Sequence, residues 1–479
     1  MFAGGLDIGT SGCKIVLYNE KGEHSKSAYK EYNVKRTSGL HEIDSKEIFE
    51  SVKSVIKEVA CKELASIAVT SFGETFVMLD EKDEPCAPSM LYTDSRGSAE
   101  CKTLAEKFGA DNLSYKTGAK PHEMFSLPKI MWIKNNMPEN FERAKYILLM
   151  QDYIVYMLCG KRQIDYSLAT RTLAFDIKNK HWDSEILNFC GIDEKLFSKP
   201  VPSGSAADKI KAGIAEELGL SADTIIVNGC HDQVAAMIGA SVFEPEDVMD
   251  GTGTVECIPV IMNDVPKDFS LYEHGYSITH HINGKFVCYV LSYAGGASLK
   301  WFRDNFSDIS YAEMDKLVIE KPSDLLIMPY FAGAATPYMD STAKAAIIGL
   351  TFEHGKYDIY KALMEGTAFE IKLNLEVLEK FGVKPVTLIA TGGGANSDVW
   401  LQIKADVLGV PVKALKGDEI GSAGTALLAG RAVGMYSESE KLTEERKTFY
   451  PNKEKTAFYK TQFEKYKKIY NATKEINEN

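Results

Sequence analysis

Short apolar runs joined by polar, glycine-containing turns open this chain of 479 residues. In the stretch 3–18, AGGLDIGTSGCKIVLY, apolar residues flank the small hydroxylated centre GTSG at 9–12. This pattern predicts a β-hairpin whose turn lies in that centre. A second strand–turn–strand pattern follows at 248–261, with the turn DGTGT at 250–254. The two copies, one near the start of each half, indicate an internal repeat of one supersecondary unit.

Helical and strand patterns alternate along the rest of the chain. Asp44 is a good helix N-cap, with Glu47 three residues on, and apolar positions recur at helical spacing over 48–59. Three short apolar runs are typical of buried parallel strands: 66–71, 225–228 and 386–390. The alternation predicts an α/β fold.

Two other segments have a distinct character. Residues 147–158, ILLMQDYIVYML, predict an almost entirely apolar helix, in which the buried carboxylate of Asp152 needs a partner. We interpret Asp152 as a structural residue. The tail, 444–479, is charged and is expected to form a helical element on the surface.

Composition excludes several classes of protein. The chain is 45% hydrophobic and 25% charged, and its formal net charge of −12 makes a nucleic-acid or membrane-surface partner unexpected. The N-terminus MFAGGLDIG lacks the regions of a signal peptide, and no apolar run approaches the ~18 residues of a spanning helix. The nine cysteines include no C-x-x-C pair, which favours reduced thiols over a metal site or a disulfide framework. These properties predict a cytoplasmic globular protein.

The first hairpin turn carries candidate phosphate chemistry. Asp7 precedes the turn and Lys14 follows it, and Gly12 is expected to adopt a positive φ. A carboxylate for hydrated Mg²⁺, a group of N–H and hydroxyl donors, and a cation together suit a triphosphate. The alternative is an ordinary buried hairpin with a glycine turn.

Two carboxylates follow predicted strands. Glu74 lies after the run at 66–71, and ligands of open α/β sheets bind at the carboxyl ends of strands. It is therefore a candidate substrate contact, with a solvated turn glutamate as the alternative. Asp232 lies where a strand passes into a helix of small residues, and a carboxylate at a helix N-terminus is expected to stay ionised. It suits a general base, with a simple N-cap as the alternative.

Three consecutive glycines, 392–394, follow the predicted strand at 386–390 and precede a helix. Because they carry no side chains, a flat or anionic ligand can approach the backbone closely there.

Taken together, these motifs resemble those of the FGGY family of carbohydrate kinases, which includes xylulose, ribulose, fuculose, gluconate and glycerol kinases. The resemblance runs from Gly5 to about Gly434. Four segments carry it: LDIGTSGCK at 6–14, GCHDQVAAMIGA at 229–240, MDGTGT at 249–254, and a block from Gly349-Leu350 through ALMEG at 362–366 to GGGANSDVWLQIKADVLGVPV at 392–412. The last block is highly specific, and all four occur in the family's order.

The resemblance implies two actin-like (ribonuclease H-like) ATPase domains of α/β class, with the active site in the cleft between them. We place the domains at 1–242, with the sugar side, the first phosphate hairpin and the catalytic base, and at 243–479, with the nucleotide side. The implied reaction is ATP plus a sugar hydroxyl giving ADP plus a sugar phosphate, with Mg²⁺ as cofactor. Phosphoryl transfer needs alignment, charge neutralisation and a base near the acceptor hydroxyl.

The resemblance also assigns roles to individual residues. Asp232 matches the general base, and Asp7, together with Asp232, the carboxylates near Mg²⁺. The residues implied to bind the nucleotide are Thr10, Ser11, Lys14, Thr252, Gly296, Gly393, Gly394 and Asn396. Glu74 takes the place of a sugar contact that is often His in pentulose kinases and Glu in glycerol kinases.

Departures from the family concern the substrate. Gly73 stands where glycerol kinases have Arg, and a Met-His pair would be expected at 73–74 in a pentulose kinase. Met124 falls where glycerol kinases have an aromatic contact. His231 replaces a small residue and either lines the sugar pocket or caps the turn.

The hypothesis is therefore an ATP-dependent kinase of a small ketose, such as a pentulose or hexulose, with a glycerol or polyol kinase as the alternative. An actin-like ATPase and a non-catalytic sugar sensor are further alternatives. We expect the sugar and ATP as partners, and neither nucleic acid nor a membrane. The oligomeric state that we consider is a homodimer.

Overall fold

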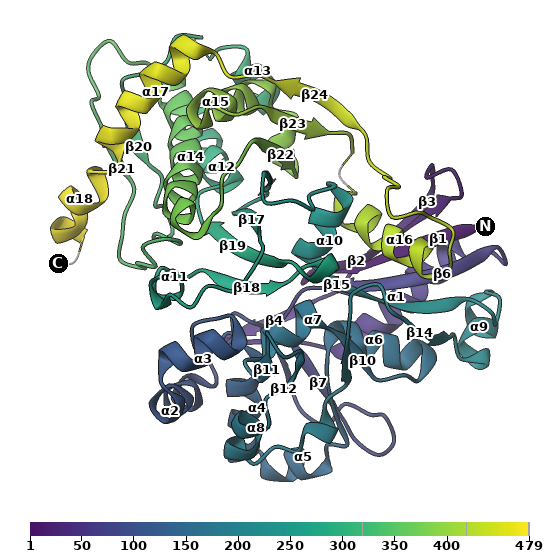
Figure 1. Ribbon diagram of the computed structural model, residues 1–479. Helices are drawn as coiled ribbons and strands as arrows, with labels where there is room; N and C mark the ends of the chain where they lie inside the picture. Colours follow the sequence, from purple (N-terminus) through teal and green to yellow (C-terminus); the bar gives the residue numbers. More distant parts are fainter. Residues whose placement is uncertain (319, 418, 478–479) are drawn as a thin grey trace. The chain divides into compact units, whose positions relative to one another are not determined.

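The computed structural model describes residues 1–318, 320–417 and 419–477, and the chain divides into two compact units (Figure 1). The first unit contains Met1–Ser241, Ser277–Phe286 and Glu419–Leu442, and the second contains the other described residues. Each unit is built on a mixed β-sheet covered by helices. The domain limits 1–242 and 243–479 stay a prediction.

The sheet of the first unit carries the first predicted hairpin. Its strands, in spatial order, are β14 (Ala206–Lys209), β15 (Ile225–His231), β6 (Leu64–Ser71), β1 (Phe2–Ile8), β2 (Gly12–Asn19) and β3 (His24–Glu31). β1 and β2 are antiparallel, and Gly9 N–H donates to the Gly12 carbonyl at 2.9 Å, so the predicted hairpin is confirmed. β1, β6 and β15 are parallel, with Ser71 paired to both Ile8 and His231. The carboxyl ends of these three strands therefore meet at one edge of the sheet.

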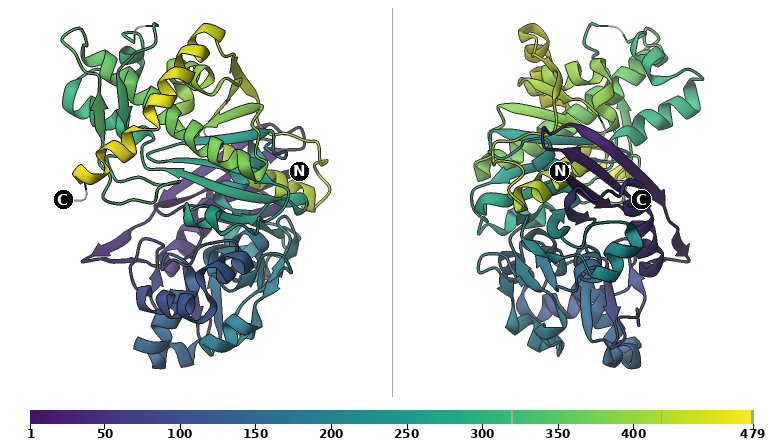
Figure 2. Two further views of the ribbon diagram at one scale, coloured as in Figure 1. Left: turned by 60° about the vertical axis from the view of Figure 1, so that its left-hand side comes forward. Right: turned by 90° about the vertical axis from the view of Figure 1, so that its right-hand side faces the viewer.

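Helices far apart in the sequence pack on this sheet. α1 (Ser45–Val59) starts as predicted, because the Asp44 carboxylate accepts hydrogen bonds from the N–H groups of Lys46 (2.9 Å) and Glu47 (3.3 Å). α10 (Asp232–Gly239) packs on α16 (Ile420–Ala432), and α16 also lies along β1, the light green helix beside the purple strand in Figures 1 and 2. The small residues of these helices permit the close approach.

The remainder of the first unit packs either in the same hydrophobic cluster as the sheet or around a second one. Its elements are β4 (Val34–Thr37), β5 (Leu40–Ile43), β7 (Phe76–Leu79), β8 (Ser89–Met90), α2 (Ser98–Phe108), α3 (Ala110–Thr117), α4 (Ser126–Asn136), α5 (Pro138–Arg143), β9 (Tyr146–Leu149), α6 (Met150–Cys159), β10 (Gln163–Asp165), α7 (Tyr166–Ala169), β11 (Phe175–Asp176), β12 (His181–Trp182), α8 (Ser184–Cys190), β13 (Lys199–Val201), α9 (Ala212–Leu218) and β18 (Ser277–His280).

The single helix predicted over 147–158 is wrong at its start. Residues 147–149 belong to β9, which pairs antiparallel with β7, and α6 begins only at Met150. An apolar run that is buried on all sides has no periodicity to separate strand from helix, so only the pairing partner decides.

The sheet of the second unit repeats the plan of the first. Its strands include, in spatial order, β19 (Phe286–Ser292), β17 (Glu256–Met262), β16 (Asp247–Thr252), β22 (Thr387–Thr391), β23 (Val412–Leu415) and β24 (Glu445–Phe449). β16 and β17 form the second hairpin, and β16 runs parallel to β22 with Gly251 paired to Thr391. In both units, the first strand of a hairpin thus lies parallel to a later strand, as the internal repeat indicates.

Helices and a smaller sheet complete the second unit. They are α11 (Phe269–Glu273), α12 (Gly296–Phe306), α13 (Tyr311–Asp315), α14 (Lys356–Leu378), α15 (Asp398–Leu408), α17 (Lys453–Tyr466) and α18 (Ile469–Asn477), with the strand pair β20 (Leu326–Met328) and β21 (Ala346–Ile348). None of the helices in the described part of the chain combines the length and apolarity that a membrane span requires.

The expectation of a purely helical surface tail is wrong. The tail begins with β24, and α17 buries Tyr459, Phe463 and Tyr466 in the core of the second unit. The Tyr459 hydroxyl donates to the Glu365 carboxylate at 2.6 Å. The charged residues lie on the outer side of an amphipathic helix, which the high charge of the segment obscured. Residues 478–479 lie outside the described residues.

Candidate active site

The turn of the first hairpin presents hydroxyl groups at the surface of the first unit. Ser11 is exposed and Thr10 is half-buried. Tyr32 braces the turn, because its hydroxyl lies 3.0 Å from the Gly12 carbonyl and its N–H donates to the Ser11 carbonyl at 3.2 Å. Gly12 does not adopt the expected positive φ; a side chain there would instead collide with the Tyr29 hydroxyl, 2.6 Å from its Cβ.

Asp7 and Lys14 face each other across the hairpin. The Lys14 ammonium forms an ion pair with Glu419, which directly precedes α16. Burial and, to a smaller extent, the charge of Asp232 raise the pKa of Asp7 to about 7, although Lys14 opposes the rise. Asp7 and Asp232 therefore lie close enough for their charges to interact.

Asp232 is the first residue of α10, directly after β15. Its Oδ1 accepts a hydrogen bond from Gln233 N–H at 2.6 Å, and its side chain is 33% exposed. Burial raises the pKa of Asp232 to about 6, although the Gln233 N–H and the Arg171 charge oppose the rise. The loss of water thus outweighs the helix N-terminus in setting the pKa, but with a pKa near 6 the carboxylate is still mostly ionised at pH 7.

Glu74 is held by an arginine that the sequence did not single out. The Arg171 Nε donates to Glu74 Oε1 at 2.6 Å, and its guanidinium lies 5.0 Å from the centre of the Phe125 ring. Glu74 is only 4% exposed, so it is not a solvated turn residue. It has a φ of +66°, a conformation found often at functional sites, and Ser126 Oγ donates to its carbonyl at 2.6 Å.

His231 packs between this ion pair and Asp232. Its ring lies against Gly73, where a Cβ would be 3.2 Å from His231 Cδ2 and 3.1 Å from Arg171 Cγ. His231 Nε2 is 3.4 Å from Asp232 Oδ1. Burial and the Arg171 charge lower the pKa of His231 to about 3, so the ring is neutral near pH 7. The absence of a side chain at Gly73 thus makes room for both neighbours.

Two further residues flank this group. Tyr92 is 42% exposed. Its pKa is raised by burial and by the charges of Glu74 and Asp232, which indicates that Tyr92 lies near both carboxylates. Sequence reasoning missed Tyr92 because no local pattern marks it. Met124 packs against the second hydrophobic cluster, and its role at the substrate stays a prediction.

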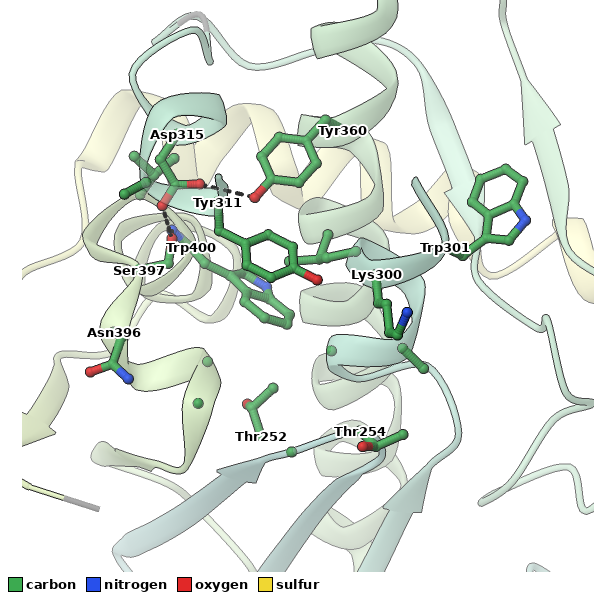
Figure 3. Close-up of a pocket in the computed structure, with 18 of the residues that line it drawn as sticks. Thr252, Thr254, Lys300, Trp301, Tyr311, Asp315, Tyr360, Asn396, Ser397 and Trp400 are labelled. Atoms are coloured by element: carbon green, nitrogen blue, oxygen red, sulfur yellow. Dashed lines mark hydrogen bonds between the residues drawn. The ribbon is translucent and has the colours of Figure 1, made fainter. Parts of the chain in front are cut away.

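The second unit contains a pocket of about 990 Å³. Among its lining residues are all five that were predicted for the nucleotide in this part of the chain: Thr252, Gly296, Gly393, Gly394 and Asn396 (Figure 3). Aromatic residues missing from that prediction also line it: Trp301, Tyr311, Tyr360 and Trp400. At one end, Asp315 accepts hydrogen bonds from Tyr360 (3.1 Å) and Ser397 (2.7 Å).

The pocket can accommodate a flat aromatic ligand between its walls. Figure 3 shows the rings of Tyr311 and Trp400 above the turn that carries Thr252 and Thr254. Aromatic faces and glycine backbone are the surfaces on which a planar base stacks.

Comparisons with known proteins agree with the motifs. Residues 2–239 match the N-terminal domain model of the FGGY family of carbohydrate kinases, and residues 246–433 match its C-terminal domain model. The chain is 29% identical to the xylulose kinase of Bacillus subtilis, over 99% of this chain and 97% of that protein. It is 31% identical to glycerol kinase 2 of Thermotoga maritima, over 91% of each.

The fold agrees as well. The crystal structure of ligand-bound xylulose kinase from Lactobacillus acidophilus superposes with a TM-score of 0.90 at 26% identity, and the match covers 98% of each chain. With matches to both domain models over most of its length, this chain belongs to the FGGY family of carbohydrate kinases.

Proposed function

We propose that this kinase transfers the γ-phosphoryl group of ATP to a hydroxyl of a small ketose, with Asp232 as general base. One observation carries the proposal: a partly exposed carboxylate with a pKa near 6 lies beside an arginine–glutamate pair and a neutral histidine. A carboxylate in that range is ionised at neutral pH and can accept the proton of an alcohol as the phosphoryl group is transferred. Among its relatives are proteins named xylulose kinases, and this favours a ketose as the substrate.

The acceptor side is built from Glu74, Arg171 and His231. A buried carboxylate and guanidinium offer fixed acceptors and donors to a polyhydroxylated substrate. Arg171 aligns Glu74, and the neutral His231 ring lies next to the Asp232 carboxylate. In this proposal these side chains orient one sugar hydroxyl towards Asp232.

We propose that each hairpin turn, in its own unit, contacts phosphate oxygens. Thr10, Ser11 and Lys14 provide hydroxyls and a cation, and Lys14 exchanges Glu419 for phosphate oxygens when ATP binds. Thr252 lies at the second turn, and the glycines at 393 and 394 let the nucleotide approach the backbone.

Asp7 and Asp232 fit Mg²⁺. The charge of Asp232 raises the pKa of Asp7, so the two carboxylates lie near each other, and a cation between them would relieve that repulsion. In the described residues, no group of three or more His, Cys, Asp or Glu gathers as a full metal shell, and Mg²⁺ bound to a nucleotide needs only one or two carboxylates. The ion would supply charge neutralisation at the phosphate oxygens.

We further propose that residues 1–242 and 243–479 form the two domains of a cytoplasmic enzyme. Met124 and Asn396 are proposed contacts of the sugar and the nucleotide, respectively.

A polyol such as glycerol is the second candidate. Glycerol kinases have Arg directly before this Glu, and here Arg171 brings a guanidinium to Glu74 from another element while Gly73 leaves the space. A glutamate–arginine pair is thus present despite the departure in sequence.

A substrate panel tests the proposal. ADP release is measured with ATP, Mg²⁺ and each of a set of pentuloses, hexuloses, gluconate and glycerol. We expect ADP release that depends on one ketose. Dependence on glycerol alone would favour the second candidate, and ADP release that no acceptor changes would contradict both.

A further inference from the structure

A fully buried cluster of charged residues lies beneath the second hairpin turn. Asp250 and Thr252 on β16 and Glu256 on β17 point to the same side of the hairpin, where Thr252 is paired with Glu256. Lys404 of α15 extends into this group, and all four residues are at most 1% exposed.

The Lys404 ammonium has three protons and three acceptors here. It donates to the Asp250 carboxylate, to Thr252 Oγ1 at 2.8 Å and to Glu256 Oε1 at 2.7 Å. The Lys404 side chain also lies over the Trp400 ring at 4.7 Å, and Trp400 lines the pocket. One lysine therefore connects the second turn with the aromatic wall of the pocket.

These hydrogen bonds determine which further hydrogen bonds the Thr252 hydroxyl can form. Its oxygen already accepts from Lys404, and its single proton is directed to Asp250 Oδ1 (2.8 Å) or Glu256 Oε1 (3.0 Å). A hydroxyl has only one proton to donate. A phosphate oxygen near Thr252 therefore meets the backbone of the turn, and the side chain serves as an anchor.

The anchored turn is fixed from other sides too. A Cβ at Gly394 would lie 2.6 Å from Thr252 Cβ, so the glycine loop packs directly on this residue. Gly296 N–H at the start of α12 donates to the Gly253 carbonyl at 2.7 Å. Removal of Lys404 would leave these two contacts of the turn in place. Only the Thr252 side chain would lose the hydrogen bond that anchors it.

The burial of these charged side chains is unfavourable in free energy, because each charge loses its contact with water. Burial raises the pKa of Glu256 to about 7, Lys404 opposes the rise, and Asp250 adds to it. Glu256 Oε2 is buried and has no hydrogen-bond partner among the described residues. Buried ion clusters contribute less to stability than apolar packing would, so a positional role is the better explanation.

We propose that Lys404 is a positioning residue for phosphate binding: it holds Thr252, and through it the second turn, in the conformation that binds the nucleotide phosphates through backbone groups. The inference rests on the proposed nucleotide site.

Two variants test the inference. Lys404→Met removes the anchor but leaves two buried carboxylates uncompensated, which threatens folding. Lys404→Met/Asp250→Asn removes one positive and one negative charge, and so keeps the net charge of the cluster. The dissociation constants of ATP and adenosine are measured by isothermal titration for each variant that folds, with thermal unfolding as the check.

We expect ATP to bind at least about tenfold more weakly, the scale of a charge-assisted hydrogen bond, while adenosine stays within about threefold of wild type. Lys361→Met is the matched control, since Lys361 is a buried lysine paired with Glu365 in the same unit and does not line the pocket. It should lower thermal stability without a selective loss of ATP.

ATP affinity within twofold of wild type in the folded double variant would overturn the inference, and so would an equal loss of ATP and adenosine. Failure of the wild type to bind ATP would instead refute the proposed nucleotide site itself.

Discussion

At the scale of single residues, the proposed acceptor side contains charges held near one another in a small space. Asp232, Asp7 and Glu74 are carboxylates at the carboxyl ends of neighbouring parallel strands, and Arg171 is the cation that faces one of them. Their burial makes each substitution there a test of a specific role.

Asp232→Asn keeps the shape of the side chain but removes the proton acceptor. We expect kcat to fall by about 10²-fold or more, the usual contribution of a general base, while ATP and sugar still bind. Steady-state kinetics with the substrate that the panel identifies, together with binding titrations, measure this. A kcat near that of wild type would show that Asp232 is not the base.

Arg171→Met should leave the Glu74 carboxylate buried without its cation. We expect a loss of roughly 3–5 kcal/mol in unfolding free energy and at least a tenfold rise in KM for the sugar. The double variant Arg171→Met/Glu74→Gln should recover much of the stability but not the KM. If the double variant also recovers the KM, the pair has only a structural role.

At the scale of elements, the close packing of α10 and α16 positions Asp232. A Cβ at Gly424 of α16 would lie 1.9 Å from the Ala235 carbonyl of α10. The helix that begins with Asp232 is therefore held in place by a contact that only glycine permits.

Gly424→Ala should force these helices apart. We expect a loss of about 1–3 kcal/mol or more from overpacking, together with a lower kcat. Gly213→Ala is the matched control: no atom of the described residues lies within 4 Å of a Cβ at this position in α9, so it should gain up to about 1 kcal/mol from helix propensity. Chemical denaturation measures both, and equal effects would contradict the packing argument.

Within α6, the buried Asp152 makes stability depend on pH. Its Oδ2 accepts from Ser198 Oγ at 2.6 Å, and burial raises its pKa to about 8. In the unfolded chain the pKa is near 4, so between about pH 4 and 8 unfolding releases a proton, and the free energy of unfolding falls as pH rises.

Asp152→Asn should remove this contribution, which amounts to at most about 1.4 kcal/mol per pH unit. Urea denaturation of wild type and variant at pH 5, 6, 7 and 8 measures the difference. The exposed Asp223, which pairs with Lys209, provides the control Asp223→Asn. A difference between wild type and Asp152→Asn that does not change with pH would show that Asp152 is ionised in the folded protein.

At the scale of the whole molecule, nucleotide binding should stabilise the fold. ATP at 100 times its dissociation constant adds about 2.7 kcal/mol to the free energy of unfolding and raises the melting temperature. Gly393→Val places a side chain at the wall of the pocket, where a Cβ meets no atom within 4 Å in the described part of the chain. We expect its melting temperature without ligand to match wild type and the rise with ATP to disappear. A full rise would place the nucleotide elsewhere.

Much of the fold could be predicted from local patterns. Both hairpins, the Asp44 cap and the strand before Gly392 depend on residues next to one another in the chain, and all are present. The start of α6 was misplaced because strand pairing with β7 overrides an apolar run, and the tail was misjudged because its charges hide the buried aromatic residues of α17.

The sequence by itself determined the family, the two phosphate-type turns and the candidate base, because these depend on short motifs that follow one another in a fixed order along one chain. Only the tertiary structure decided that Arg171 pairs with Glu74, 97 residues away, and that Lys404 anchors Thr252, 152 residues away. Neither cation belongs to a recognisable local pattern. Their roles arise from burial, which makes an unpaired charge so unfavourable that distant parts of the chain must supply its partner.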